Sequence, residues 1–502
     1  MKPISIPAIA CLAACGASAP SVSTIDRRPS TTDRRPSTPR PSTVDPRPLD
    51  HRPSTSPSTS PSTSPQLTPI ELAALGSTGS ADIARSLSEE VGPRLAGSPG
   101  DKLAVAWALK TMTSLGLQNV HAEPVTVPVW KRGVETAEIV SPVHLSLAVT
   151  ALGWSGSTGK KPVVGEIVEV ISLDALKNLP KDAAKGKIIF ANVPMRRAAD
   201  GAGYGEAVPM RFAGPKLAMD LGALAFVMRT VGTAEDRNPH TGSCGLREVK
   251  NPIAAAALST VDAELLHDTL ERDPKTKISL VLTPSRGPDA QSANVVGEVP
   301  GDTHPDEIVL LGAHLDSWDL ARGAIDDGAG DAIVLEAAKL VAEHGKPHRT
   351  VRVVLFAAEE NSGAGGKAYV VAHASEVAKH VLALEADSGT ARVISSRFFG
   401  DPSKVLGYDV IMQMLKPLGV EPREGDGHPG SDITPLVAAG VPTIELRQDM
   451  SHYFDVHHSA NDTQNEIELE GIRQATAAYA DAAWVAASGG DFGRAPPMKG
   501  ER

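Results

Sequence analysis

Cysteine is scarce in this sequence: three occur in 502 residues. Cys11 and Cys15 both lie close to the N-terminus, which leaves Cys244 alone in the rest of the chain. A single cysteine cannot form a disulfide within a monomer. A fold held together by several disulfides is therefore excluded.

Long apolar runs and a surplus of basic residues are also missing. No later segment is long and apolar enough to cross a membrane. The formal net charge is −11, aromatic residues make up 4% of the chain, and no stretch interleaves aromatic with basic side chains. Because proteins that bind nucleic acids carry basic surfaces, we expect no nucleic-acid partner.

The N-terminal segment MKPISIPAIACLAACGASAP resembles a bacterial lipoprotein signal. It contains one lysine, a short apolar run and the sequence LAAC, which is typical of cleavage before a lipid-bearing cysteine. We therefore predict a signal peptide at 1–14 and a lipid anchor at Cys15, the only membrane contact expected. An ordinary secretory signal is the alternative. Either signal predicts export, to the periplasm or cell envelope as a lipoprotein, or as a secreted protein.

A stretch rich in proline, serine and threonine follows, with repeated RRPST and STSP units. This composition offers too few apolar side chains for a core, so we interpret residues 15–66 as a disordered tether. From about residue 67 the pattern becomes globular, and Thr68 followed by Pro69 is typical of a helix start. Residues 67–128 then form the first part of a main domain, and residues 491–502 form a C-terminal tail.

Residues 129–284 differ in character, because strand-like segments such as VVGEIVEVI and TKISLVLTP dominate them. One helix is expected here, at about 214–221, and the glycine-rich residues 198–210 are interpreted as a turn or a flexible lid. We predict a smaller β-rich domain inserted into the main one.

Residues 285–490 alternate between strands and helices. The strands are DEIVLLGAHLDS, TVRVVLFAAEE, HVLALEADSG and VPTIELRQ, and helices are expected at 328–344, 366–380, 402–418 and 466–487. Near-continuous apolar strands that alternate with helices predict an α/β fold whose sheet is covered on both faces. Functional side chains should then gather at the carboxyl ends of the strands.

Histidines and carboxylates follow these strands. They are His314, Asp316, Asp326, Asp327, Glu359, Glu360, Asp387, His457, His458 and Asp462. Each residue alone suits a helix cap or a solvated loop. Their occurrence after successive strands favours a shared site.

The mixture of imidazole and carboxylate groups is typical of zinc ligands. Two cations close together share a carboxylate and cancel the repulsion between crowded acids, and one further carboxylate must remain free to move a proton. Glu359 and Glu360 place two such carboxylates side by side. At the end of an extended strand their side chains are expected to point to opposite sides.

Several motifs together resemble the M28 family of co-catalytic zinc peptidases. They are GPRLAGSPG, NVVGEVPG, IVLLGAHLDSWDLARGAIDDGAG, AAEENSGAGGKAYV, EADSG, GSDITPLVAAGVP and YFDVHHSANDT. The resemblance covers about residues 67–487. It implies a three-layer αβα zinc-exopeptidase domain of the phosphorylase/hydrolase type, at 67–128 and 285–490, with a protease-associated-like insert at 129–284.

The resemblance implies two Zn²⁺ ions as cofactors. His314 and Asp387 are expected to hold the first ion, Glu360 and His458 the second, and Asp326 to bridge both. A cis peptide bond is common in the family after the bridging residue, here between residues 326 and 327.

The resemblance also implies catalytic and substrate-binding roles. Glu359 is expected to act as the general base and then the general acid, and Asp316 to orient the first imidazole ligand. Ser431, Asp432 and His428 are expected to contact the substrate, although a capped helix start at Ser431 explains the same residues.

Either histidine of the sequence HHSANDT suits a metal. The family pattern of a histidine, three residues and then an acid selects His458 with Asp462. His457 is then left to donate to the oxyanion of the tetrahedral intermediate.

The activity implied is exopeptidase hydrolysis of dipeptides or short peptides with a free N-terminus, by a metal-bridged hydroxide. The resemblance also suggests a homodimer. Two alternatives remain open at this point: another amide hydrolase or a glutaminyl cyclase on the same fold, and a non-catalytic surface receptor.

Overall fold

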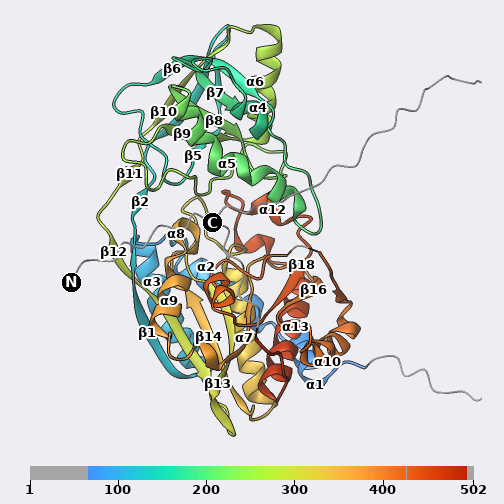
Figure 1. The fold of residues 1–502 in the computed structure, drawn as a ribbon. Helices are drawn as coiled ribbons and strands as arrows, with labels where there is room; N and C mark the ends of the chain where they lie inside the picture. The colour runs from blue at the N-terminus through green and yellow to red at the C-terminus, as the bar shows by residue number, and fades with distance from the viewer. Residues whose placement is uncertain (1–65, 426, 495–502) are drawn as a thin grey trace, which may run out of the picture. The chain divides into compact units, whose positions relative to one another are not determined.

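A mixed eight-stranded sheet contains the first strand of the chain and all strands from residue 290 onward (Figure 1). The computed structural model describes residues 66–425 and 427–494. In spatial order the strands are β1 (Gln118–Val127), β12 (Ala290–Val299), β14 (Arg349–Phe356), β13 (His304–His314), β15 (His380–Glu385), β18 (Thr443–Gln448), β16 (Val393–Phe399) and β17 (Glu421–Pro422). The four strands from β14 to β18 are parallel, so their carboxyl ends lie at one edge of the sheet.

Helices cover both faces of this sheet, because alternate strand residues are apolar on each side. Leu311 and Val353 pack on one face, and Leu310 and Val354 pack on the other. The helices of the first face are α1 (Pro69–Gly76), α2 (Gly79–Glu90), α3 (Pro99–Ser114), α7 (Gly328–His344), α10 (Leu406–Leu415) and α13 (Leu469–Ala487). Those of the second face are α9 (Ala364–Ala372) and α11 (Thr434–Ala438). The predicted three-layer α/β architecture is confirmed.

A second eight-stranded sheet lies within residues 129–284. Its order is β4 (Leu145–Leu147), β3 (Glu135–Ser141), β10 (Lys277–Leu282), β6 (Val163–Val170), β7 (Ile188–Ala191), β8 (Ala225–Arg229), β9 (Ala254–Leu258) and β5 (Val149–Ala151). Strands β6 to β9 are parallel and pack in two apolar clusters. The helices of this segment are α4 (Leu173–Lys177), α5 (Ala202–Asp220) and α6 (Thr260–Arg272). The segment is therefore an α/β unit in its own right, with more helix than predicted.

Two short strands join the ends of this segment. β2 (Trp130–Lys131) pairs with β11 (Ser285–Arg286), next to the point where β1 pairs with β12. We call residues 129–284 the insert. Its boundaries stay a prediction, because all described residues belong to one compact unit.

Local chemistry explains several element starts. The side chain of Thr68 caps α1 in a capping box with Glu71, and Pro69 occupies the first turn, as predicted. Asp327 caps α7 by accepting from the N–H of Gly330, and α7 spans the predicted 328–344. The peptide bond before Asp327 is cis, as the resemblance implied.

The strand before the paired glutamates is shorter than predicted. β14 ends at Phe356, Ala358 has a φ of 59°, and a short helix, α8 (Glu359–Ser362), begins with the glutamates themselves. The expectation that they lie on opposite sides of an extended strand was therefore wrong. Helical rotation of about 100° per residue separates their side chains instead.

Three other assignments differ from the structure. Helix α5 covers most of the segment interpreted as a turn or lid, although Pro209 and Pro215 lie inside it. Helix α9 ends at Ala372, before a separate 3₁₀ turn, η1 (Val377–Lys379). Helix α10 begins at Leu406 rather than at residue 402.

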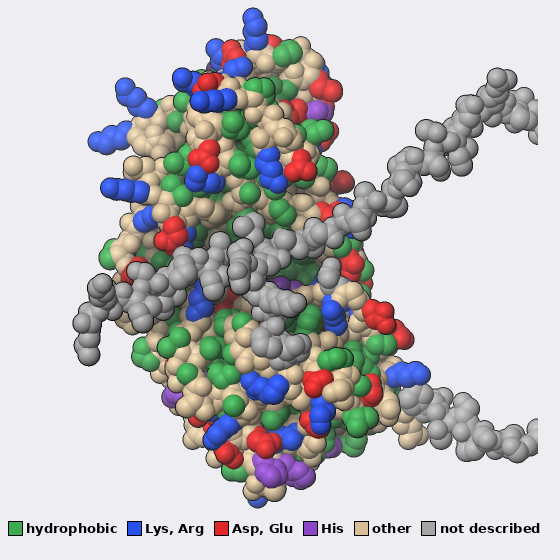
Figure 2. All heavy atoms as spheres, viewed as in Figure 1, with side chains coloured by type: hydrophobic (Ala, Val, Ile, Leu, Met, Phe, Trp, Pro, Cys, Tyr) green, Lys and Arg blue, Asp and Glu red, His purple; other side chains and the backbone are tan. Residues whose placement is uncertain are grey.

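The predicted signal peptide, Cys15 and nearly all of the tether lie outside the described residues, as do residues 495–502. Within the described part of the chain, no helix has the length and apolar character needed to cross a membrane. Figure 2 shows Lys and Arg side chains interspersed with Asp and Glu over the lower part of that view.

Candidate metal centre and active site

The predicted ligands meet at the carboxyl ends of the parallel strands β13, β14 and β15. His314 is the last residue of β13, Glu360 lies in the helical turn after β14, and Asp387 follows β15. Asp326 precedes α7, and His458 follows the short helix α12 (Tyr453–Val456). Residues distant in the sequence thus reach one place, as the parallel strand order dictates.

The distances between these groups divide them into two halves. The Nε2 atom of His314 lies 3.1 Å from Asp326 Oδ1 and 3.7 Å from Asp387 Oδ1. The Nε2 atom of His458 lies 3.3 Å from Asp326 Oδ2 and 3.0 Å from Glu360 Oε2. The two oxygens of Asp326 therefore face two different histidines, which is the arrangement of a bridging carboxylate.

The donor set fits divalent cations. Ligand atoms of His314, Asp326 and Glu360 lie within 4.8 Å of one another, as do those of Asp326, His457 and His458. In the described part of the chain, Asp326 Oδ2 and Glu360 Oε1 are buried and accept no hydrogen bond. A cavity of about 10 Å³ lies against Asp326, Glu360 and His458. Imidazole nitrogens with unshared carboxylate oxygens suit zinc.

The electrostatics of the cluster favour a cation as well. Burial raises the pKa of Glu360 well above its usual range, and the Asp326 charge adds to this effect. Burial lowers the pKa of His314, but hydrogen bonds to Asp316, Asp326 and Asp387 outweigh it and leave that pKa well above the usual value. One imidazolium cannot neutralise so many carboxylates, and a divalent ion relieves their repulsion.

Asp316 contacts His314 more closely through its backbone than through its carboxylate. The Nδ1 atom of His314 lies 3.0 Å from the backbone oxygen of Asp316, and 3.7 Å from its carboxylate. The carboxylate accepts instead from the backbone N–H of Glu359 at 2.9 Å. Asp316 therefore orients His314 through its carbonyl group and fixes the start of α8 through its side chain.

Two further carboxylates accept backbone N–H groups beside the predicted ligands. Asp462 accepts from the N–H groups of Ile325 at 2.7 Å and Asp326 at 3.1 Å. Both oxygens of Asp327 accept backbone N–H groups, from Gly330 and from His314. These hydrogen bonds suit a supporting role for both carboxylates, and ligand atoms of Asp327 also lie within 4.8 Å of those of His314 and Asp387.

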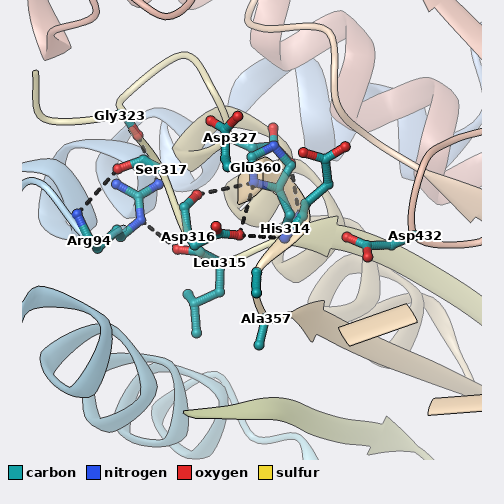
Figure 3. A network of polar contacts seen from close by, with 12 residues as sticks. Arg94, His314, Leu315, Asp316, Ser317, Gly323, Asp327, Ala357, Glu360 and Asp432 are labelled. Carbon is teal, nitrogen blue, oxygen red and sulfur yellow. Dashed lines mark hydrogen bonds and ion pairs between the residues drawn. The ribbon is translucent and has the colours of Figure 1, made fainter. Parts of the chain in front are cut away.

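Arg94 fixes the loop that follows β13, a role that the sequence did not reveal. Its guanidinium is fully buried and donates to the carbonyl oxygens of Leu315 at 2.6 Å, Arg322 at 2.9 Å and Gly323 at 2.9 Å (Figure 3). The loop that it holds contains Asp316. The only signal was indirect: Arg94 lies in the GPRLAGSPG motif that contributed to the resemblance.

Glu359 lies beside the cluster but is in none of the groups of described residues that could hold a metal. Burial raises the pKa of Glu359 to about 7; nearby His314 lowers it, Asp387 raises it, and a hydrogen bond to Ser431 lowers it. A carboxyl group that titrates near neutral pH can both accept and return a proton.

The adjacent histidines have different neighbours. His457 Nε2 lies 3.6 Å from Asp326 Oδ2, farther than His458, and approaches no second carboxylate of the described chain within 4 Å. The two imidazole rings stack, with centroids 3.6 Å apart. Tyr204 and Tyr453 enclose His457. His458 is thus the better placed of the two as a ligand.

The predicted substrate contacts are less uniform. Ser431 is exposed and hydrogen-bonds the general-base candidate. His428 is exposed at the surface, and desolvation by the protein atoms around it lowers its pKa. Asp432 is 1% exposed and accepts from the N–H of Gly366 at 3.2 Å; Figure 3 shows it apart from the dashed contacts around His314. Its interior position gives the predicted substrate contact no support.

Trp318, in the loop after β13, packs inside the protein. It is 4% exposed and meets Trp130 of the insert and His458 edge-on, with ring centroids 6.1 and 5.9 Å apart. The side chain therefore connects the insert with the metal centre.

Comparisons with known proteins agree with this geometry. Residues 294–483 match peptidase family M28. Mouse carboxypeptidase Q is 36% identical over 80% of this chain and 84% of its own length. The crystal structure of an M28 peptidase precursor from Shewanella amazonensis superposes with a TM-score of 0.83 and 43% identity, over 86% of this chain and 98% of that one. A zinc aminopeptidase from Bacillus subtilis shares the fold, with a TM-score of 0.61 and 19% identity, over 83% and 97% of the two chains.

The fold and the site together define a metal-dependent hydrolase of the zinc exopeptidase class. The chain belongs to peptidase family M28 and is a zinc metallopeptidase that acts as an exopeptidase. The relatives found are peptidases, so the alternatives of a glutaminyl cyclase, another amide hydrolase and a non-catalytic receptor gain no support.

Proposed function

We propose that this exopeptidase removes residues from dipeptides or short peptides with a free N-terminus and works with two zinc ions. The observation that supports it best is Asp326, whose two oxygens face His314 on one side and His458 on the other. Asp387 completes the first half of the site and Glu360 the second. The similarity to carboxypeptidase Q favours short peptides as substrates.

The chain's own groups divide the chemical work. When bound, the zinc ions supply Lewis acidity that polarises the scissile carbonyl and makes water acidic. Glu359 takes the proton from the attacking water and delivers it to the leaving amine. The carboxylate of Asp316 accepts from the backbone N–H of Glu359 and so keeps Glu359 in place. His457, whose pKa burial holds well below the usual value, stays neutral and donates to the developing oxyanion.

Replacement of the general base tests the mechanism. Glu359→Gln keeps the size of the side chain but cannot carry the proton, so turnover should fall by about 10²–10⁴-fold. Zinc content should stay unchanged, because Glu359 is not among the proposed ligands. The measurement is kcat together with metal analysis of the purified protein.

Glu343→Gln provides the matched control, since Glu343 lies at the exposed end of α7 and pairs with Lys339. This control should retain full turnover. Substantial residual activity in Glu359→Gln, with zinc retained, would refute the general-base role.

A peptide panel tests the substrate class. Free and N-acetylated forms of the same dipeptides and tetrapeptides should differ in their rates of cleavage, and the free dipeptides should be cleaved fastest. Equal cleavage of the acetylated forms would contradict the proposal of a free N-terminus.

We also propose export with a lipid anchor at Cys15. The support is the LAAC sequence after a short apolar run. Mass spectrometry of the mature protein from its native cells should find an N-terminal cysteine that carries acyl groups. A mature N-terminus without lipid would favour the ordinary secretory signal.

A further inference from the structure

A four-residue segment of the insert, His240–Ser243, lies against the backbone of the metal centre. The imidazole Nδ1 of His240 is 2.5 Å from the carbonyl oxygen of His457. The N–H of Thr241 donates to the carbonyl oxygen of His458 at 2.9 Å. Because the acceptor on His457 is a carbonyl oxygen, Nδ1 of His240 must carry the hydrogen. The loop that contains His457 and His458 is thus held by two successive residues of the insert.

The same segment reaches the other ligand of that half of the site. The hydroxyl of Ser243 donates to the carbonyl oxygen of Glu360 at 2.7 Å. A second contact from the insert supports this turn, since the indole N–H of Trp154 donates to the carbonyl oxygen of Asn361 at 2.8 Å. Glu360 and His458 are the two residues whose side chains approach each other to 3.0 Å. One short segment therefore holds the backbones of both.

Other residues of the insert hold this segment in place. The N–H of Gly153 donates to the Gly242 carbonyl at 2.9 Å, and the hydroxyl of Thr241 donates to the Ala151 carbonyl at 2.8 Å. Gly242 has a φ of 128°, and a Cβ atom there would approach the guanidinium of Arg211 to 2.3 Å. Only glycine fits this position. These contacts fix the segment, so it can in turn fix the backbones of His458 and Glu360.

We propose that His240 and Ser243 are positioning residues that set the distance between Glu360 and His458, so that the insert determines how tightly the second zinc ion is bound. The inference rests on the proposed ligand assignment. It gives the insert a function within the metal centre, in addition to any that it has in covering the substrate. A ligand whose support is removed loses pre-organisation, and affinity for the metal falls with it.

Zinc affinity measures this effect directly. Ser243→Ala and His240→Leu each remove one donor, and each should weaken binding of the second zinc ion by about tenfold. The measurement is the zinc dissociation constant of the full-length protein, obtained by competition with a chromogenic chelator. His240→Asn places an amide N–H where the imidazole N–H was and should restore most of the affinity.

Kinetics separate positioning from a general loss of structure. With excess zinc, the Ser243→Ala enzyme should recover wild-type kcat and KM, because only occupancy of the site is altered. Ser157→Ala is the matched control, since Ser157 donates to the Leu282 carbonyl at 3.1 Å within the insert. It should leave zinc affinity unchanged, and the melting temperatures of the metal-free proteins should agree.

The outcomes distinguish this inference from the proposed function. Unchanged zinc affinity in Ser243→Ala and His240→Leu would overturn the inference, even if Glu360→Ala and His458→Ala lose one zinc ion as the ligand assignment requires. Loss of affinity in Ser157→Ala to the same extent would also overturn it, because the effect would then not be specific to the segment. Retention of two zinc ions in Glu360→Ala and His458→Ala would refute the ligand assignment itself.

Discussion

The two adjacent histidines of the active site show how burial prepares a metal ligand. Burial lowers the pKa of both His457 and His458 well below the usual value, so each ring is neutral at physiological pH. A neutral imidazole offers its lone pair to zinc without first losing a proton. Position then decides between the two rings, because His458 alone approaches two carboxylates, Asp326 and Glu360.

This difference predicts the metal content of two variants. His458→Ala should lose about one equivalent of zinc, because it removes the only nitrogen ligand of that half of the site. His457→Ala should keep both ions and instead lose turnover. Metal analysis after gel filtration checks both results, and the reverse pattern would exchange the two assignments.

The types of residue in the site were predictable, whereas several of their roles were not. Histidines and carboxylates after apolar strands leave a clear pattern, and the resemblance ordered them. The Nδ1 atom of His314 donates to the backbone oxygen of Asp316, and a backbone atom has no signature in a sequence. Arg94 likewise donates to backbone carbonyl oxygens, so its partners could not be recognised in the sequence.

Helices α1 and α13 are joined by a buried pair of carboxyl groups. Both Glu71 and Asp481 are fully buried, and the Thr68 hydroxyl donates to Asp481 at 3.2 Å. Burial raises the pKa of Asp481 to about 8, with contributions from the charge of Glu71 and the hydrogen bond between the two acids. Asp481 therefore holds a proton in the folded protein at neutral pH.

A pH-dependent stability follows from this pair. The unfolded chain loses the Asp481 proton near pH 3.9 and the folded protein near pH 8, so the folded state binds more protons in between. The contribution of this group to stability therefore falls as the pH rises from about 4 to about 8.

Asp481→Asn should remove that dependence. The amide cannot ionise and keeps one donor and one acceptor, so the variant should exceed the wild type in stability at pH 8 by about 1–3 kcal/mol and match it near pH 4. Urea unfolding at both pH values is the measurement. Asp268→Asn, on the exposed face of α6, is the control and should change neither value. A variant less stable than the wild type at pH 8 would contradict the protonated pair.

Elements differed in how far their sequences revealed them. Helix α7 has a capping residue, an apolar stripe and a terminal glycine, and its bounds were predicted correctly. Strand β9 consists of alanines and one leucine, residues that favour helices, and it forms a strand because it lies between β8 and β5 with all five residues buried. Helix α5 was hidden by its prolines and glycines. Tertiary packing determined the secondary structure of both elements, and residue propensities in a single sequence do not report on packing.

At the scale of the whole molecule, the metal centre is also a source of stability. Several buried carboxylates face one another at its middle, and their repulsion opposes folding when no cation is present. A ligand that binds only the folded state adds about 2.7 kcal/mol at a concentration of 100 times its Kd.

Chelation should therefore lower the melting temperature by several degrees, and added zinc should restore it. Differential scanning calorimetry with and without chelator measures the shift. Asp326→Ala serves as the comparison, because without the bridging carboxylate the chelator should have little further effect. An unchanged melting temperature in the wild type would show that the cluster is stable without cations.

The contacts between the insert and the centre could not have been predicted from the sequence. Ser243 and Glu360 are far apart in the chain, and a serine hydroxyl that binds a carbonyl oxygen follows no motif. The strand pattern and the resemblance revealed that an insert exists. They did not show that it touches the ligands.

The pairing of β1 with β12 has a consequence for how the protein is made. Val127 lies opposite Ala290, so the two strands that flank the insert are neighbours in the catalytic sheet. During synthesis β1 emerges before every other strand of its sheet and stays unpaired until β12 has been made. All strands of the insert sheet have been made once β10 has emerged. Translation therefore delivers the segment that holds the metal ligands before β13 to β18 bring the ligands to it.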